Sequence, residues 1–153
     1  MATVYSAQRT NALAIPSVNN KPNELAGRIR VAHGTYEADA LPQNDVIEMF
    51  VLPDGARLLH GSIAHDALGA NTTLAVGYGA HANAAGTAVS AAAAAYKAAA
   101  ASTSAGKSDV LATLALGSGT EVDANEDGLP VTVTLGGGAG TGTIELTVFY
   151  VVD

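Results

Sequence analysis

From residue 28 onward the chain consists of short segments rich in β-forming residues, each ended by a strong turn signal. Residues 45–52 (DVIEMFVL) stop at a Pro-Asp-Gly sequence, and residues 57–65 (RLLHGSIAH) follow almost at once. Proline presets φ for a turn, aspartate bonds to nearby backbone, and glycine accepts a positive φ. The close spacing of these two segments predicts a β-hairpin. Gly61, inside the second segment, predicts a bulge or a close approach by another backbone.

The carboxyl-terminal third has the same character. Residues 131–135 (VTVTL) and 143–152 (TIELTVFYVV) flank a glycine-rich connection, which predicts a second hairpin. Residues 143–152 alternate between two faces, with Ile144, Leu146, Val148 and Tyr150 on one and Glu145, Thr147 and Phe149 on the other. Residues 28–36, 72–78 and 109–116 are further strand candidates. Roughly seven or eight strands in all predict a mainly β fold, an antiparallel β-sandwich of the jelly-roll kind.

An alanine-rich segment interrupts this pattern. Residues 88–104 contain two runs of alanine on either side of Tyr96 and Lys97. Alanine is the best helix former, Ser90 is suited to an N-cap, and Gly106 stands where a helix would end. The segment therefore predicts one helix inserted among the strands.

Residues 1–24 are predicted to form an extended arm, and residues 25–153 a single domain. The arm mixes Asn, Ser, Pro and Thr with isolated apolar residues and shows neither a helical nor a strand period. We expect this arm to bind a partner protein, and the residues expected to carry the binding are Arg9, Leu13, Ile15, Val18 and Lys21. Residues 1–30 hold four basic residues against one acid, so an acidic partner surface is favoured, with a scatter of solvated charges as the alternative.

Composition excludes several classes of function. The net charge of −7 disfavours nucleic-acid binding, and the absence of cysteine excludes disulfides and thiolate metal sites. Neither a signal peptide nor a membrane-spanning segment is recognisable, so we expect synthesis in a cytoplasm and no membrane partner. Only 14% of residues are charged and 5% are aromatic, although 48% are apolar. Such a sparsely charged, small-residue chain is expected to pack against neighbours, including copies of itself.

Asp123, Asn125 and Asp127, followed by a glycine, match the opening of a calcium-binding loop. The closing position, where a bidentate glutamate is needed, is Thr134. The flanking sequence predicts strands rather than the two helices that accompany such a loop. A solvated turn is therefore the favoured interpretation and a weak Ca²⁺ site the alternative.

No catalytic or cofactor-binding site is predicted. Residues 101–108 match only a relaxed phosphate-loop pattern, and the expected order of helix and then strand is the reverse of what that loop needs. The four histidines, His33, His60, His65 and His81, lack the spacing of a metal-dependent jelly-roll enzyme and are expected at the surface or an interface. Ser62 lies near His60, His65 and Asp66 in sequence, but neighbours along one strand do not build a triad.

The stretch from residue 25 to residue 78 resembles the capsid cement or head decoration proteins of tailed bacteriophages. The resemblance rests on five motifs. The last two strand candidates resemble the same proteins, and with them the resemblance covers about two-thirds of the chain. The five motifs are GRIRV at 27–31 with TYEA at 35–38, VIEMFVL at 46–52, LPDGARLLHG at 52–61, DALGANTTL at 66–74 and VGY at 76–78. It implies a β-sandwich displayed as a homotrimer on the outside of the virion shell, bound to the major capsid protein.

The sequence thus predicts a structural virion protein without enzymatic activity or cofactors, which stabilises a capsid from its exterior. The alternative is a receptor- or carbohydrate-binding module displayed on a virion or cell surface. Such modules usually present Trp or Tyr platforms, and this chain has no Trp and only five scattered Tyr.

Overall fold

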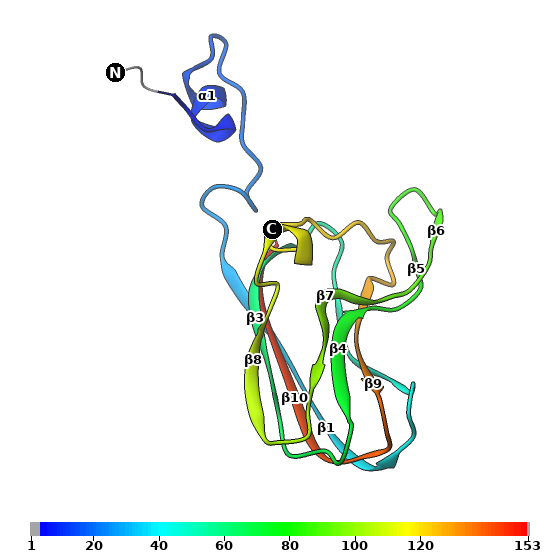
Figure 1. The fold of residues 1–153 in the computed structure, drawn as a ribbon. Helices are drawn as coiled ribbons and strands as arrows, with labels where there is room; N and C mark the ends of the chain where they lie inside the picture. Colours follow the sequence, from blue (N-terminus) through cyan, green and yellow to red (C-terminus); the bar gives the residue numbers. More distant parts are fainter. Residues whose placement is uncertain (1–3, 153) are drawn as a thin grey trace.

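The computed structural model describes residues 4–152, which form two packed antiparallel sheets and an amino-terminal arm. One sheet has the strand order β1-β10-β3-β8 and the other the order β2-β9-β4-β7, while β5 and β6 pair separately (Figure 1). The elements are α1 (Ala7–Leu13), β1 (Ile29–Leu41), β2 (Val46–Leu52), β3 (Arg57–His65), β4 (Thr73–Tyr78), β5 (His81–Ala82), β6 (Ala88–Val89), β7 (Ala92–Ala101), β8 (Gly106–Val110), the 3-10 turn η1 (Leu114–Leu116), β9 (Leu129–Gly136) and β10 (Gly140–Val151). The predicted antiparallel β-sandwich is confirmed, and its strand order is compatible with a jelly roll.

Both predicted hairpins are wrong. The turn at residues 53–55 connects β2 in one sheet to β3 in the other, and the glycine-rich connection likewise carries the chain from β9 to β10 in the opposite sheet. Instead, β10 pairs with β1 and β3, and β9 pairs with β2 and β4. Alternation along a strand specifies which face is buried but not which strand lies alongside, so the same turn residues serve a hairpin or a crossing between layers.

The core lies between the two sheets. In β10, the side chains of Ile144, Leu146 and Val148 are buried, as the alternation predicts. Tyr150 is only half-buried and Val151 is buried instead, so the alternation breaks at the end of β10. Each fully buried Leu or Ile contributes about 1.5–3 kcal/mol relative to an exposed one.

Gly61 illustrates how closely the strands pack. A Cβ at this position would lie 2.5 Å from the carbonyl oxygen of Thr147 and 2.8 Å from Cγ2 of Val110. The predicted close approach at Gly61 is therefore present, while the shift of register lies nearer the start of β3.

The predicted alanine-rich helix is wrong. Residues 88–104 contain strand β6 and strand β7, and β7 forms the edge of its sheet beside β4. The helix propensity of alanine is worth less than about 1 kcal/mol per residue, so burial and strand pairing override it. Tyr96, buried in the core, is the residue that ties this strand to the sandwich. A bulge opposite Gly77 brings Tyr96 inward, and the carbonyl oxygen of Ala92 leaves no room for a side chain at Gly77.

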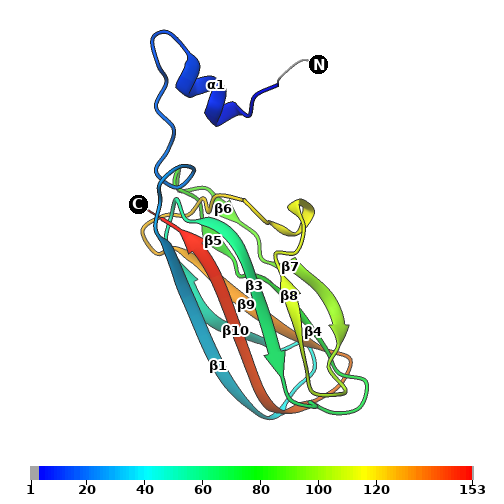
Figure 2. The same cartoon turned by 90° about the vertical axis from the view of Figure 1, so that its left-hand side faces the viewer.

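The arm leaves the sandwich at the end where the described chain also finishes, and α1 stands away from both sheets (Figures 1 and 2). The predicted absence of helical structure in the arm is wrong for seven residues, because α1 spans Ala7–Leu13 with Ser6 as its N-cap. Residues 109–116, predicted as a strand, contain the end of β8 and the 3-10 turn η1. Among residues 4–152, the helices are too short and too polar to cross a bilayer.

Candidate docking surface on the amino-terminal arm

The outer part of the arm folds into a small lobe held by its own polar groups. The Ser6 hydroxyl accepts a hydrogen bond from the Arg9 backbone N–H at 3.2 Å and so begins α1. The chain then turns back, and the Asn11 side-chain amide donates to Asn20 Oδ1 at 3.1 Å. Asn20 in turn donates to the carbonyl oxygen of Gln8 at 3.1 Å. The lobe, residues 6–20, thus presents a defined shape, although α1 contains no buried residue.

A neck, residues 21–24, attaches the lobe to the sandwich. The Lys21 ammonium group lies 2.8 Å from the Glu121 carboxylate, and the Arg57 guanidinium lies 3.0 Å from it. Arg57 also lies 3.4 Å from Glu24, and the Asn23 amide donates to the Gly55 carbonyl at 2.9 Å. The hydrogen bond from Lys21 is the main cause that lowers the pKa of Glu121 below its usual value. Lys21, predicted to bind a partner, therefore contacts its own chain.

Exposed apolar surface is concentrated near the arm. Among the described residues, twelve large apolar side chains are exposed, and eight of them belong to residues 4–31. The exposed fractions of the predicted residues Leu13, Ile15 and Val18 are 46%, 98% and 52%. Sequence analysis missed the other five, which are Val4, Tyr5, Leu25, Ile29 and Val31. The alternation of β1 assigns Ile29 and Val31 to one face but does not show that this face stays uncovered.

A groove of about 690 Å³ lies between the lobe and the neck, and Val18, Pro22 and Leu25 contribute apolar side chains to it. Three arginines lie on the arm or shortly after it in the chain. Arg9, predicted to bind a partner, is on α1, and Arg28 and Arg30 flank Ile29 at the start of β1. Within residues 4–152 the acids that form salt bridges, Glu24 and Glu121, pair with Lys21 and Arg57 rather than with these three arginines. The arm and the start of β1 therefore carry both exposed apolar side chains and three arginines that form no salt bridge within residues 4–152. At the start of β1 the arginines alternate with Ile29 and Val31 and so lie on the opposite face of the strand.

The side chains of the predicted calcium-loop residues already form hydrogen bonds, both within the loop and with the turn between β5 and β6. Asp123 Oδ1 accepts a hydrogen bond from the Ala84 backbone at 2.9 Å, and Asn125 Oδ1 accepts one from the Asp127 backbone at 3.1 Å. The Asn125 amide also donates to Asp127 Oδ2 at 2.8 Å. Thr134, the expected closing position, is in β9 and pairs with β2 and β4.

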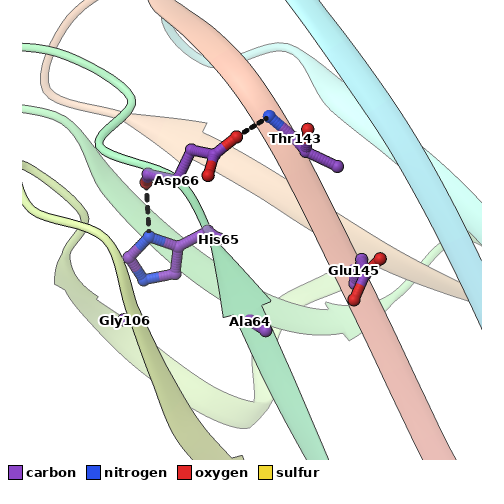
Figure 3. A pocket seen from close by; sticks show the side chains of 6 residues that line it. All are labelled: Ala64, His65, Asp66, Gly106, Thr143 and Glu145. Carbon is purple, nitrogen blue, oxygen red and sulfur yellow. Dashed lines mark hydrogen bonds between the residues drawn. The ribbon is translucent and has the colours of Figure 1, made fainter.

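A second hollow, of about 330 Å³, lies where β3, β8 and β10 meet (Figure 3). His65 Nδ1 is 2.9 Å from the Asp66 backbone carbonyl, and Asp66 Oδ2 accepts a hydrogen bond from the Thr143 backbone at 3.0 Å. The imidazole therefore contacts the backbone of Asp66 and not its carboxylate. This arrangement orients a turn between strands, and it does not join a base to the nucleophile candidate Ser62.

The remaining sequence candidates are dispersed. Residues 101–108 connect β7 to β8, a strand–turn–strand order that lacks the helix amino terminus of a phosphate loop. His33 is in β1 and bonded to Thr147 at 2.9 Å, His60 stacks on Phe149, and His81 is in β5. In the part of the chain that the structure describes, no three acidic or histidine side chains gather as metal ligands would.

The fold is shared with chains from bacteriophage capsids. The chain resembles one in the structure "Cyanophage Pam1 capsid asymmetric unit" with a TM-score of 0.64 and 22% identity over 100% of both chains. A chain in "Capsid of Ralstonia phage GP4" matches with a TM-score of 0.61 and 23% identity, over 83% of this chain and 86% of that one. A chain in "Acidic stable capsid structure of Helicobacter pylori bacteriophage KHP30" matches with a TM-score of 0.52 and 13% identity, over 81% and 87%.

No protein-family model and no curated protein sequence matches the chain. At these identities the structural likeness defines the class of fold: an antiparallel β-sandwich that occurs in phage capsids. The predicted resemblance to phage capsid-associated proteins is thus supported by structure as well as by the motifs between residues 25 and 78.

Proposed function

We propose that this protein is a non-enzymatic virion component that binds the outside of a bacteriophage capsid and stabilises the shell. The observation that carries the proposal is the concentration of exposed apolar side chains on an arm that projects from a capsid-type sandwich. An isolated monomer gains nothing from exposing Ile15 and Leu13, whereas burying them against a partner is favourable.

The proposed partner is the major capsid protein, on whose surface an acidic patch would lie beside apolar pockets. Arg9, Arg28 and Arg30 would lie opposite acidic groups of the shell, which favours correct orientation and rapid association. The neck holds the lobe in one place before binding. Because the lobe is held by Asn11 and Asn20, less conformational entropy would be lost on docking than with an unstructured tail.

The proposal includes self-association, with a homotrimer as the expected assembly on the shell. Four exposed alanines, residues 98–101, lie on edge strand β7, and such small side chains allow a second chain to approach closely. Sedimentation of the purified protein should show an oligomer of about three 15.2 kDa chains. A stable monomer at micromolar concentration would remove this part of the proposal while leaving the arm's role intact.

The test of capsid binding is removal of residues 2–20, which deletes the lobe but keeps the neck and its salt bridges. We expect the sandwich to fold with an unchanged melting temperature, because α1 contributes no buried residue. Binding to capsids stripped of this protein should fall at least about tenfold, equivalent to roughly 1.4 kcal/mol. If the truncated protein decorates capsids as tightly as the intact one, the docking surface lies elsewhere on the sandwich.

A further inference from the structure

A third hollow lies at the end of the sandwich from which the arm projects, beside the short strands β5 and β6 (Figure 2). It has a volume of about 230 Å³ and is lined by core residues, including Leu58 and Leu129, and by aromatic side chains. This volume is below the range of roughly 300–1,000 Å³ that drug-sized ligands need. The site therefore fits a small molecule or a single side chain of a partner.

Tyr96 is the residue that points to a ligand. Its side chain is 93% removed from solvent, since only 7% remains exposed, yet none of the side-chain hydrogen bonds within residues 4–152 involves its hydroxyl. Gly117 packs against the ring edge, where a Cβ would lie 3.0 Å from Cδ1 of Tyr96. Burial, and to a smaller extent Tyr78, raises the pKa of Tyr96, so the phenol stays protonated. The hydroxyl is not one of the fully buried polar atoms without a partner within residues 4–152, so it opens into the hollow, where a bound group can reach it.

Besides its aliphatic side chains, the lining contains three aromatic rings, those of Tyr78, His81 and Tyr96. The rings of Tyr78 and Tyr96 are 5.8 Å apart, and His81 meets Tyr78 edge-on at 5.5 Å. His81 Nδ1 is 3.1 Å from the Gly79 carbonyl oxygen, a contact that holds the ring beside Tyr78. Aromatic faces attract cations and also contact alkyl chains.

Charge at the rim selects a cation. Glu121 is already paired with Lys21 and Arg57, but Asp123 also lines the site and forms no salt bridge within residues 4–152. Three further acids lie on the adjoining loops, and within the described chain they too are without a salt bridge: Asp54, Glu126 and Asp127. Fields of one sign at the rim of a low-dielectric hollow raise the local concentration of the opposite charge.

We propose that this pocket binds an alkylammonium group. The ammonium would donate hydrogen bonds to the Tyr96 hydroxyl oxygen and to the Asp123 carboxylate, and the alkyl stem would lie against the tyrosine rings. Two sources offer this chemistry: a lysine side chain of the shell, if the protein decorates capsids as proposed above, or a free diamine.

The direct test titrates the ¹⁵N-labelled full chain with n-butylammonium chloride and, as the matched uncharged probe, with 1-butanol plus equal sodium chloride. Saturable shifts are expected at the Leu111 amide, which donates to the Tyr96 carbonyl at 2.9 Å. Butanol should bind at least about tenfold more weakly, because it lacks the charge-assisted hydrogen bond. Equal binding of the two probes, or no saturable shift up to about 100 mM, would overturn the proposal.

Variants separate the site from the fold. Y96F should weaken butylammonium binding by about threefold to tenfold, while the free protein melts at an unchanged temperature because the hydroxyl makes no hydrogen bond within the described chain. D123N should weaken binding by a similar factor, and Y36F, on an exposed tyrosine of β1, should change nothing. Wild-type affinity in both Y96F and D123N would show that the cation binds elsewhere.

Capsids stripped of this protein distinguish the two sources of the alkylammonium group. If a shell lysine fills the pocket, Y96F decorates capsids more weakly and butylammonium competes with wild-type decoration. If decoration is unaffected, 1,4-diaminobutane must perturb the same amides as butylammonium, and its failure to do so contradicts the proposal. A protein that does not bind capsids at all refutes the proposed function, while the titration still decides the pocket.

Discussion

In the sandwich most of the large aliphatic side chains of β3, β9 and β10 are buried, whereas in the arm side chains of the same type are exposed. Leu146 has no exposed surface, and Ile15 is 98% exposed. The two regions also differ in what holds them together. The sandwich is held by hydrogen-bonded strands in two packed sheets, and the lobe of the arm is held by the hydrogen bonds of Asn11 and Asn20. The difference indicates that the sandwich is folded by its own core, while the apolar surface of the arm is available to a partner.

The largest expected effect tests this division in the isolated protein. Leu146→Ala should destabilise the fold by about 2–5 kcal/mol, because it removes a buried side chain and leaves a cavity. Ile15→Ala should change the free energy of unfolding by no more than about 0.5 kcal/mol, as for other exposed positions. Urea denaturation of both variants measures the contrast. A loss above about 1 kcal/mol for Ile15→Ala would show that the arm packs within the free protein.

The strands of the sandwich could be predicted from the sequence, but their partners could not. Alternation placed Ile144, Leu146 and Val148 on a buried face, and the structure confirms it. The connections at residues 53–55 and 136–142 cross between sheets, because turn chemistry specifies a reversal of direction and not the layer that follows. Strand pairing is determined by how whole sheets pack together, and this information is not present in any single segment of the sequence.

Local propensity misled in both regions of the molecule. In residues 92–101 the alanines favoured a helix, but the burial of Tyr96 and the pairing with β4 determine a strand. In the arm, α1 begins at the N-cap Ser6, a local signal that the sequence analysis did not use. The acceptor-lined pocket could not be found from sequence, because Tyr78, Tyr96 and Asp123 come from separate segments.

A second prediction sharpens the comparison by using two exposed side chains of similar size. Ile15→Ser in the arm should weaken binding to stripped capsids by about fivefold, roughly 1 kcal/mol, through lost apolar burial. Leu114→Ser is the matched control, since Leu114 is 85% exposed but lies in η1, away from the arm. A capsid co-sedimentation assay compares them. If the two substitutions weaken binding equally, the apolar surface of the arm has no special role.

The neck between the two regions should respond weakly to acid. The pKa of Glu121 is lowered in the folded protein, chiefly by its hydrogen bond with Lys21, so its ionisation stabilises the fold above the ordinary pKa of 4.5. This contribution is lost as the pH falls from that value through the lower, folded pKa. Because the pair is largely solvent-exposed, the loss should be at most about 1 kcal/mol. Glu121→Gln should remove only that pH-dependent part, and an identical acid dependence of stability in wild type and variant would contradict the assignment.

The smallest expected effect concerns Ca²⁺, and it tests whether the acidic loop belongs to the self-sufficient sandwich. Ca²⁺ takes six to eight oxygen ligands. In the loop, however, Asp123 Oδ1 and Asn125 Oδ1 already accept backbone hydrogen bonds, and Thr134 is paired within β9. Addition of a chelator should therefore leave the melting temperature unchanged, as should millimolar CaCl₂. A ligand present at 100 times its dissociation constant would stabilise the fold by about 2.7 kcal/mol, which shifts a melting curve by several degrees. A calcium-dependent shift of that size, abolished by Asp127→Asn, would mean that the loop rearranges to bind a cation. This end of the sandwich would then depend on a ligand, as the arm is proposed to depend on a partner.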